Sequence, residues 1–359
     1  MKSNHSSRNA SPLRPAFSGV ASFKVENLSI GDDMHPVIHA GRVAVITGAA
    51  SGIGRAAARE FASLGLKVAI ADKNEQELEA LGKKLVEQVG EGNVLVVPTD
   101  VSNLEQVVSL RDKVYDAWGE VSSFTTSMRG VPWIVQGMRY LDQRRLPLFI
   151  SINRCQLSQV AVLLNNAGIG IKGTSWEGID KWREIFDVNL FGVINVQQTF
   201  VPRMIHQENQ AVIITTGSKQ GITNPPGNPA YNASKAAIKS LTESLAYELR
   251  ERPHNNVTAH LFIPGWTFTG LTGANGAGAE KPRGAWTAED TVLYMLDKVR
   301  EGDFYIVVPD NETKREVDQL RIMWGAADIA ENRPALSRWH PSYKSLFEEY
   351  MREGLAQLE

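Results

Sequence analysis

The sequence has little of three features that would narrow its class at once: cysteine, net charge and long apolar runs. The single cysteine, Cys155, excludes an intramolecular disulfide and indicates an intracellular compartment. The formal net charge of −2 gives no indication of a nucleic-acid partner or an anionic membrane surface. No apolar run reaches the roughly 18 residues that a membrane-spanning helix needs. We therefore expect a globular protein without nucleic-acid or membrane partners.

Acidic residues are absent before Glu26, whereas Lys2, Arg8, Arg14 and Lys24 lie among many serines. Two interpretations fit this composition. A disordered tail is favoured, because the apolar residues form no helical stripe. A mitochondrial targeting segment is the alternative. We expect residues 1–40 to be such a tail or targeting segment, and the protein to be cytoplasmic, with the mitochondrial matrix as the second compartment considered.

From Arg42 onward, short apolar and β-branched runs alternate with helical patterns. The expected strands are RVAVITG, KVAIAD, NVLVVPTD, VAVLLNNAG, AVIITTGS, NVTAHLFIPG and FYIVVPD. This alternation predicts an α/β fold, a doubly wound parallel sheet of the Rossmann type, with ligands at the carboxyl ends of the strands. One domain is expected over residues 41–310, followed by a helical C-terminal extension over 311–359. One continuous helix is expected over residues 179–205, and another opens with a capping pattern at Thr287 and Asp290.

The segment TGAASGIG lies between the first expected strand and the first expected helix. Gly48 permits a tight turn, Gly52 lets a pyrophosphate approach the backbone, and Gly54 lets the helix pack closely. The helix N-terminus then offers free N–H groups to phosphates. Glycines alone are weak evidence, but a strand before them and a helix after them favour a dinucleotide site.

Asp72 ends the second expected strand, 18 residues after Gly54. A carboxylate at this place accepts hydrogen bonds from ribose hydroxyls and repels a 2′-phosphate, which favours NAD over NADP. A helix N-cap is the alternative role for Asp72. Lys73 and Arg55 could partly offset the repulsion, so NADP stays open as a second cofactor.

The segment YNASK places Tyr231 and Lys235 on one face of a helix, 13 and 17 residues after Ser218. A nearby ammonium favours a phenolate, so we expect Lys235 to lower the pKa of Tyr231 and make it an acid/base group near neutral pH. Ser218 follows a strand at the carboxyl edge of the expected sheet. The glycine motif and this pair therefore converge on one crevice.

With these segments the chain resembles the short-chain dehydrogenase/reductase family. The resemblance covers roughly Arg42 to Gly270 and rests on TGAASGIG, Asp100-Val101, NNAG, Asn189 in NLFG, Ser218, YNASK and PGWTFT. It implies a catalytic set of Asn189, Ser218, Tyr231 and Lys235. Tyr231 would exchange a proton with the substrate oxygen, Lys235 would hold the nicotinamide ribose, Ser218 would bond the reacting oxygen, and Asn189 would hold a water.

The resemblance also implies a cofactor site and partners. The cofactor-binding residues it implies are Gly48, Ser51, Gly52, Ile53, Gly54, Asp72, Asp100, Val101, Asn166, Gly168, Tyr231, Lys235 and Thr269. Three of the implied residues have alternative roles. Asn189 could bridge backbone groups between the sheet and a helix, Ser218 could be a turn residue after Gly217, and Thr269 could be the N-cap of a short helix. No metal is expected. The implied reaction is NAD(P)-dependent interconversion of a secondary alcohol and a ketone or aldehyde, in a homodimer or homotetramer. Trp266, Phe268 and Trp286 lie in a glycine-rich segment, which suggests a mobile lid over an apolar substrate. A flexible loop whose aromatic residues pack on the core is the alternative.

Two other functions remain open at this stage. One is an NADPH-preferring carbonyl reductase, and the other is a dinucleotide-binding regulator without turnover. The complete set of four catalytic positions argues against the regulator.

Residues Val121–Gln159 interrupt the expected junction between a helix and the fourth strand. These 39 residues hold five arginines, one acid and no sustained period of 2 or 3.6. Val-Ser can be encoded by GTAAGT and Gln by CAG, which match common intron borders, so we hypothesise a retained intron. A genuine inserted arm is the alternative. Either would enter at the amino edge of the sheet, opposite the cofactor crevice.

Overall fold

A computed structural model describes residues 37–118, 159–273 and 280–358 of the chain. Its strands are β1 (Val43–Thr47), β2 (Lys67–Asp72), β3 (Val94–Pro98), β4 (Val160–Asn165), β5 (Ala211–Thr216), β6 (Val257–Ile263) and β7 (Tyr305–Val307). They form one parallel sheet in the order β3-β2-β1-β4-β5-β6-β7. The predicted doubly wound fold is confirmed.

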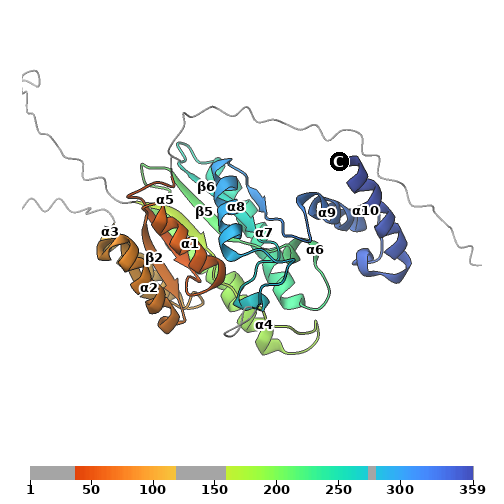
Figure 1. Ribbon diagram of the computed structural model, residues 1–359, viewed down its shortest axis with the longest axis horizontal. Coiled ribbons are helices and arrows are strands. Elements are labelled where there is room, and N and C mark those ends of the chain that lie inside the picture. The colour runs from red at the N-terminus through yellow and green to blue at the C-terminus, as the bar shows by residue number, and fades with distance from the viewer. Residues whose placement is uncertain (1–36, 119–158, 274–279, 359) are drawn as a thin grey trace, which may run out of the picture. The chain divides into compact units, whose positions relative to one another are not determined.

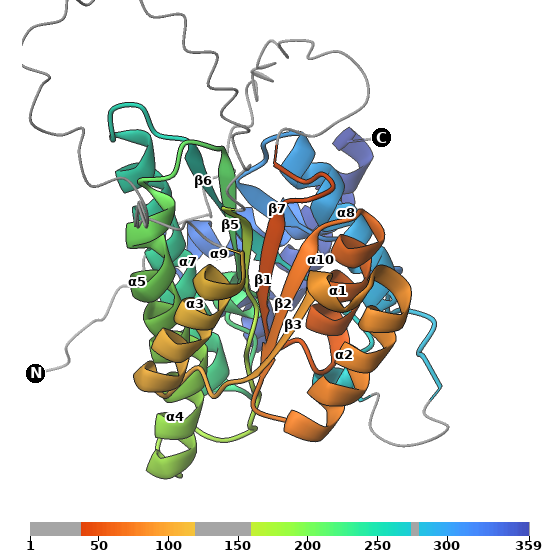
Figure 2. The same cartoon turned by 90° about the vertical axis from the view of Figure 1, so that its left-hand side faces the viewer.

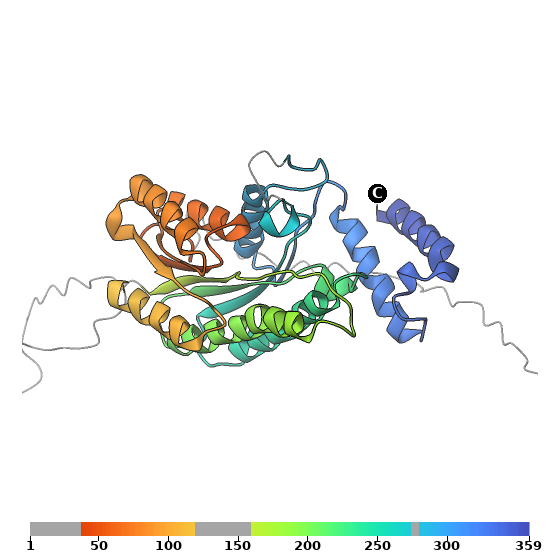
Figure 3. The same ribbon diagram turned by 90° about the horizontal axis from the view of Figure 1, so that it is seen from below.

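The strands are apolar on both faces because helices cover both faces. Every residue of β1, β4 and β5 is buried. Helices α1 (Gly52–Ser63), α2 (Glu75–Val89) and α8 (Ala288–Arg300) cover one face. Helices α3 (Leu104–Trp118), α5 (Val193–Met204) and α7 (Pro229–Arg250) cover the other face. Figures 2 and 3 show the sheet between these two layers.

The region predicted as one helix over 179–205 consists of three parts. Helix α4 (Ile179–Phe186) runs into the π-helical segment η2 (Asp187–Gly192), which continues into α5. A π-helical turn widens the helix by one residue and is often found at functional sites. Here it carries Asn189. The predicted start of α8 is confirmed, since the Thr287 side chain accepts a hydrogen bond from the Asp290 N–H at 3.0 Å.

The predicted C-terminal extension is helical as well. Helix α6 (Gln220–Thr223) contacts α9 (Arg315–Ala330), which packs against α10 (Lys344–Leu358) (Figure 1). The Trp324 ring lies 5.3 Å from the Phe347 ring and 5.1 Å from the Tyr350 ring. Short 3-10 turns at Glu91–Asn93 (η1), Gly270–Thr272 (η3), Ser337–Trp339 (η4) and Pro341–Tyr343 (η5) complete the described elements.

Two of the predictions fall largely outside the described residues. These are the N-terminal tail or targeting segment and the inserted segment 121–159, of which only Gln159 is described. Gln159 is buried, and its side-chain oxygen accepts a hydrogen bond from the Asn209 N–H at 2.9 Å. The inserted segment and its two possible origins stay predictions. Among the described residues, no helix is long and apolar enough to cross a membrane.

Candidate functional site

The turn between β1 and α1 has the backbone that its glycines predict. Gly48 and Gly52 adopt φ values of +66° and +50°, which other residues rarely adopt. A Cβ atom on Gly54 would lie 2.1 Å from the Gly48 carbonyl oxygen, so only glycine lets α1 begin this close to the turn. The first N–H groups of α1 therefore sit directly beside the ends of the strands.

Asp72 holds this turn from the end of β2. Its carboxylate accepts hydrogen bonds from the Ala50 N–H at 3.0 Å and the Asn74 N–H at 2.9 Å. The alternative role of Asp72 as the N-cap of α2 is wrong, because Asn74 occupies the N-cap and accepts from the Glu77 N–H.

Arg55, one of the two cations near Asp72, is already engaged. Its guanidinium donates to the Ala50 carbonyl oxygen at 2.8 Å and pairs with the Glu77 carboxylate at 3.0 Å. Lys73 is exposed and lines the same side of the site as Asp72. Of the two cations considered in the sequence, Lys73 is therefore the one placed to meet a ligand phosphate.

A cavity of about 680 Å³ lies at the carboxyl ends of the strands and gathers most of the predicted residues. Those lining it are Gly48, Ser51, Gly52, Ile53, Asp72, Asp100, Val101, Asn166, Gly168, Ser218, Tyr231, Lys235 and Thr269. Gly54 and Asn189 do not line it; both lie behind its wall. The two halves of the predicted site thus meet in one space.

Tyr231 and Lys235 extend from the first turns of α7. The Lys235 ammonium donates to the Thr216 carbonyl oxygen at 2.8 Å and lies 5.8 Å from the centre of the Tyr231 ring. Burial lowers the pKa of Lys235 to about 8. Burial also raises the pKa of Tyr231, and a hydrogen bond with Ser218 lowers it in part.

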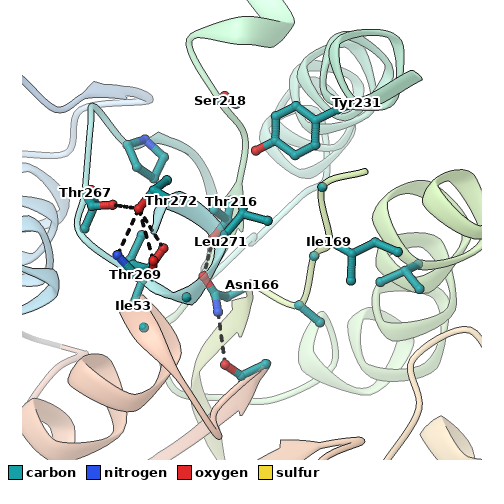
Figure 4. A pocket seen from close by; sticks show the side chains of 18 of the residues that line it. Ile53, Asn166, Ile169, Thr216, Ser218, Tyr231, Thr267, Thr269, Leu271 and Thr272 are labelled. Atoms are coloured by element: carbon teal, nitrogen blue, oxygen red, sulfur yellow. Dashed lines mark hydrogen bonds between the residues drawn. The ribbon is translucent and has the colours of Figure 1, made fainter. Parts of the chain in front are cut away.

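The predicted lowering of the Tyr231 pKa by Lys235 is therefore wrong for this structure. Burial outweighs every attraction of the phenolate, because the phenol has lost almost all contact with water. Figure 4 shows the Tyr231 ring extending toward the side of the cavity that holds Ser218. The resulting group is a phenol that keeps its proton at neutral pH and points at a hydroxyl partner.

Asn166, directly after β4, is hydrogen-bonded to the last residues of β1 and β5. Its backbone N–H donates to the Thr47 hydroxyl at 3.0 Å, and its side-chain oxygen accepts from the Thr216 hydroxyl at 3.2 Å (Figure 4). Thr47 ends β1 and Thr216 ends β5. A polar network therefore joins these strand ends. Of its members, Thr216 lines the cavity, whereas Thr47, the first residue of TGAASGIG, does not.

Asn189 acts from the π-helical segment η2. Its side chain accepts from the Ile169 N–H at 2.8 Å, and donates to the Ile169 carbonyl oxygen at 2.9 Å and to the Ser234 hydroxyl at 3.2 Å. It is completely buried. These bonds fix the segment after β4, whose Ile169 lines the cavity opposite the strand ends.

Thr269 has the N-cap position considered as its alternative role, and it also lies at the cavity where it was predicted to bind the cofactor. It is the N-cap of η3 in a reciprocal pair with Thr272, and it lines the cavity. A Cβ atom on Gly52 would lie 3.0 Å from the Thr269 Cβ atom, so the segment after β6 rests on the glycine turn. Of the three aromatic residues predicted on the substrate side, only Trp266 lines the cavity. Trp286 instead packs on Tyr294, with ring centres 5.9 Å apart.

Lys219, beside the predicted catalytic residue Ser218, is a further residue that the sequence motifs did not indicate. It lines the cavity next to Ser218, and its ammonium lies 2.5 Å from the Asp318 carboxylate and 3.5 Å from the Asp310 carboxylate. No local pattern in the sequence could have found this contact, because its partners lie in a different part of the chain. No group of His, Cys, Asp or Glu side chains in the described ranges could hold a metal ion.

A family model described as short chain dehydrogenase matches residues 42–128 and 142–280. A 1-deoxy-11-beta-hydroxypentalenate dehydrogenase of Streptomyces exfoliatus is 28% identical, over 83% of this chain and 94% of the relative. A CLA biosynthesis dehydrogenase/reductase of Lactiplantibacillus plantarum is also 28% identical, over 64% of this chain, and the match spans 66% of that relative's length.

The solved structures agree with the sequence relatives. A short-chain dehydrogenase/reductase from Burkholderia phymatum in complex with NAD is 29% identical, with a TM-score of 0.64 over 82% of this chain and 96% of that one. The matched range of the family model includes the glycine turn, Ser218, Tyr231 and Lys235. The chain belongs to the short chain dehydrogenase family.

Proposed function

We propose that this chain is an NAD-dependent oxidoreductase that interconverts a secondary alcohol and the corresponding carbonyl compound, a ketone or aldehyde, and that NADP is an accepted alternative. One observation carries the proposal. Asp72, at the dinucleotide end, and Ser218, Tyr231 and Lys235, at the reactive end, line the same cavity. A nucleotide-binding surface alone would not require the reactive end.

The residues present fit a dinucleotide. An ionised carboxylate has about four acceptor positions, and the Asp72 carboxylate uses two of them on backbone N–H groups. The others are available to the hydroxyls of an adenosine ribose. Gly48 and Gly52 give the turn its positive φ values, and the turn brings the N-terminus of α1, where a pyrophosphate would bind, to the cavity. The solved relative from Burkholderia phymatum contains NAD, which supports the same assignment here.

The nicotinamide ring supplies or accepts the hydride when the cofactor is bound. The protein then has to hold the substrate oxygen and move one proton. Burial keeps the proton on Tyr231, so this hydroxyl donates it to the carbonyl oxygen in reduction and accepts it back in oxidation. The Ser218 hydroxyl bonds the same oxygen and orients it. The Lys235 ammonium lies 5.8 Å from the centre of the Tyr231 ring, where it would attract the phenolate that remains after proton donation, although burial determines the net direction of the Tyr231 pKa.

Asn189 supports this set from outside the cavity. Its three bonds hold Ile169 and Ser234, and Ser234 in turn donates to the Tyr231 carbonyl oxygen at 2.8 Å. We therefore assign Asn189 a positioning role in the proposed tetrad.

The substrate end of the cavity is lined by apolar groups. Ile169, Trp266 and Leu271 contribute them, and Leu271 is 53% exposed, so a ligand could cover it. This supports an apolar substrate. Cytoplasmic location and assembly as a homodimer or homotetramer belong to the same proposal; they rest on the single cysteine and on the family resemblance.

The test is Tyr231→Phe, compared with Tyr247→Phe on the exposed face of the same helix. Each protein is given NAD with a panel of secondary alcohols such as 2-octanol and 1-phenylethanol, and NADH formation is followed. Loss of the phenol should lower turnover by about 10²- to 10⁴-fold. NADH affinity should stay within about twofold, and Tyr247→Phe should behave as wild type. Tight NADH binding without turnover by the wild-type protein on any alcohol or ketone would favour the non-catalytic regulator.

A further inference from the structure

One lysine, Lys219, connects helix α9 of the C-terminal extension to the catalytic end of the cavity, because it lines the cavity and pairs with Asp318 of α9. The Lys219 ammonium lies 2.5 Å from the Asp318 carboxylate of α9 and 3.5 Å from the Asp310 carboxylate after β7. Both carboxylates are buried, with side-chain exposures of 6%, and Lys219 is 20% exposed. An ion pair removed from water is weakly screened and holds its partners in a defined geometry.

The lysine is also fixed to the catalytic groups. It is the N-cap residue of α6, directly after Ser218, and the Gln220 N–H of α6 donates to the Ser218 hydroxyl oxygen at 3.1 Å. A Cβ atom on Gly221 would lie 2.5 Å from the Lys235 carbonyl carbon. Helix α6 is thus pressed against the backbone of Lys235 while its first amide holds the Ser218 side chain.

Asp310 extends the same cluster to the substrate side. Its carboxylate accepts from the Trp266 N–H at 3.0 Å and from the Thr313 N–H at 2.7 Å. Trp266 lines the cavity, and Thr313 leads into α9. The segments that carry Ser218, Trp266 and Asp318 therefore meet at one lysine.

We propose that Lys219 is a positioning residue, which uses its pair with Asp318 to hold Ser218 at the distance from the substrate oxygen that the reaction requires. The inference rests on the proposed function, and it assigns the C-terminal extension a direct part in it. Asp310 and Asp318 lie beyond residue 280, where the match to the family model ends.

Other parts of α9 support the assignment. Leu320 and Trp324 are buried against α10, and Gly354 of α10 approaches the Leu320 side chain so closely that a Cβ atom would lie 2.5 Å from it. Packing against α10 therefore fixes the position of α9, the helix that carries Asp318. A carboxylate on a fixed helix can hold the lysine in place, whereas one on a loose tail could not.

The decisive comparison is Asp318→Asn with Glu316→Gln in the full-length protein. Both remove one negative charge from the first turn of α9, but no contact joins Glu316 to Lys219. The substrate is the panel alcohol with the highest wild-type turnover. Misplacement of a reacting group by about 1 Å can cost about 100-fold in rate, so Asp318→Asn should lower kcat by about 10- to 100-fold. The Kd for NADH should change by less than about twofold, and Glu316→Gln should retain wild-type kcat.

Lys219 gives a second, independent readout. Lys219→Met should reproduce the loss of kcat, and Lys219→Arg should restore most of it, because a guanidinium can still pair with Asp318. The double variant Lys219→Met with Asp318→Asn should be no slower than either single variant, since both act through one contact. If Asp318→Asn does not fold, the comparison of Lys219→Met with Lys219→Arg decides the question.

The inference is overturned if Lys219→Met keeps wild-type kcat, if Glu316→Gln is as slow as Asp318→Asn, or if the losses of the two single variants add. Failure of the proposed function would look different, because the wild-type protein itself would then show no hydride transfer with any alcohol or ketone. If the pair has only a structural role, its loss should lower the melting temperature. The kcat measured well below the melting temperature should then stay unchanged.

Discussion

Lys235 is a cationic side chain that is almost completely shielded from water. Its residue exposure is 4%, and burial lowers its pKa from 10.5 to about 8. Because the folded-state pKa lies below the unfolded one, the unfolded chain binds more protons between about pH 8 and pH 10.5, and stability rises with pH in that window. At neutral pH the charged lysine therefore costs folding free energy. The Thr216 carbonyl oxygen recovers only part of that cost.

The same shift sets the expected pH dependence of carbonyl reduction. Reduction needs the proton on Tyr231 and the charge on Lys235, and both are present below about pH 8. We expect kcat/KM for NADH-dependent ketone reduction to be level from about pH 6 to pH 8 and to fall about tenfold per unit above it. Lys235→Arg, where it retains activity, should move the decline to higher pH. A profile that increases from pH 8 to pH 9 would contradict these roles.

At the scale of the elements, the close approach of β1 and α1 requires that residue 54 has no Cβ atom. The Cβ atom of Gly54→Ala would lie 2.1 Å from the Gly48 carbonyl oxygen, which is backbone and cannot rotate away. Gly92→Ala is a matched control, because nothing lies within 4 Å of the added atom. We expect Gly54→Ala to lower the free energy of unfolding by about 2–4 kcal/mol and to weaken NADH binding at least tenfold.

Urea unfolding and NADH fluorescence titration measure the two effects. Gly92→Ala should change the free energy of unfolding by less than about 1 kcal/mol. If both variants bind NADH equally well, the close approach of α1 is not what shapes the phosphate site.

The elements also show what the sequence could and could not predict. The strands were predictable because burial on both faces demands continuous apolar, β-branched runs such as VAVIT in β1. The π-helical segment η2 was not, because its wide turn is stabilised by tertiary bonds from Asn189 to Ile169 and Ser234 rather than by any local break in the helical pattern.

The site residues that could be predicted are those in local motifs, and those that could not are the ones whose contacts are distant in the sequence. Gly48, Asp72 and Tyr231 were predictable, since each belongs to a short motif at a strand end or helix start. The contact between Lys219 and Asp310 was not, because the two residues are 91 positions apart and neither stands out locally. The Tyr231 pKa was misjudged for a related reason: the sequence shows the neighbouring cation, but not the burial that outweighs it.

At the scale of the whole molecule, cofactor preference should appear as a difference in stability. A ligand that binds only the folded state at about 100 times its Kd adds about 2.7 kcal/mol. The Asp72 carboxylate lies beside the adenosine end of the proposed site, and the Arg55 guanidinium is held by Glu77 and the Ala50 carbonyl. A 2′-phosphate would thus meet an anion with only Lys73 to offset it.

We therefore expect NADH to raise the melting temperature of the full-length protein more than NADPH at equal concentration. Asp72→Asn removes the charge and keeps one side-chain oxygen, which can accept from either the Ala50 or the Asn74 N–H, so NADPH should then stabilise the protein at least as well as NADH. Glu75→Gln removes a charge from the same region without lining the cavity, and should leave the preference unchanged. A larger shift with NADPH in the wild-type protein would mean that Lys73 outweighs Asp72, and would identify the chain as an NADPH-preferring reductase.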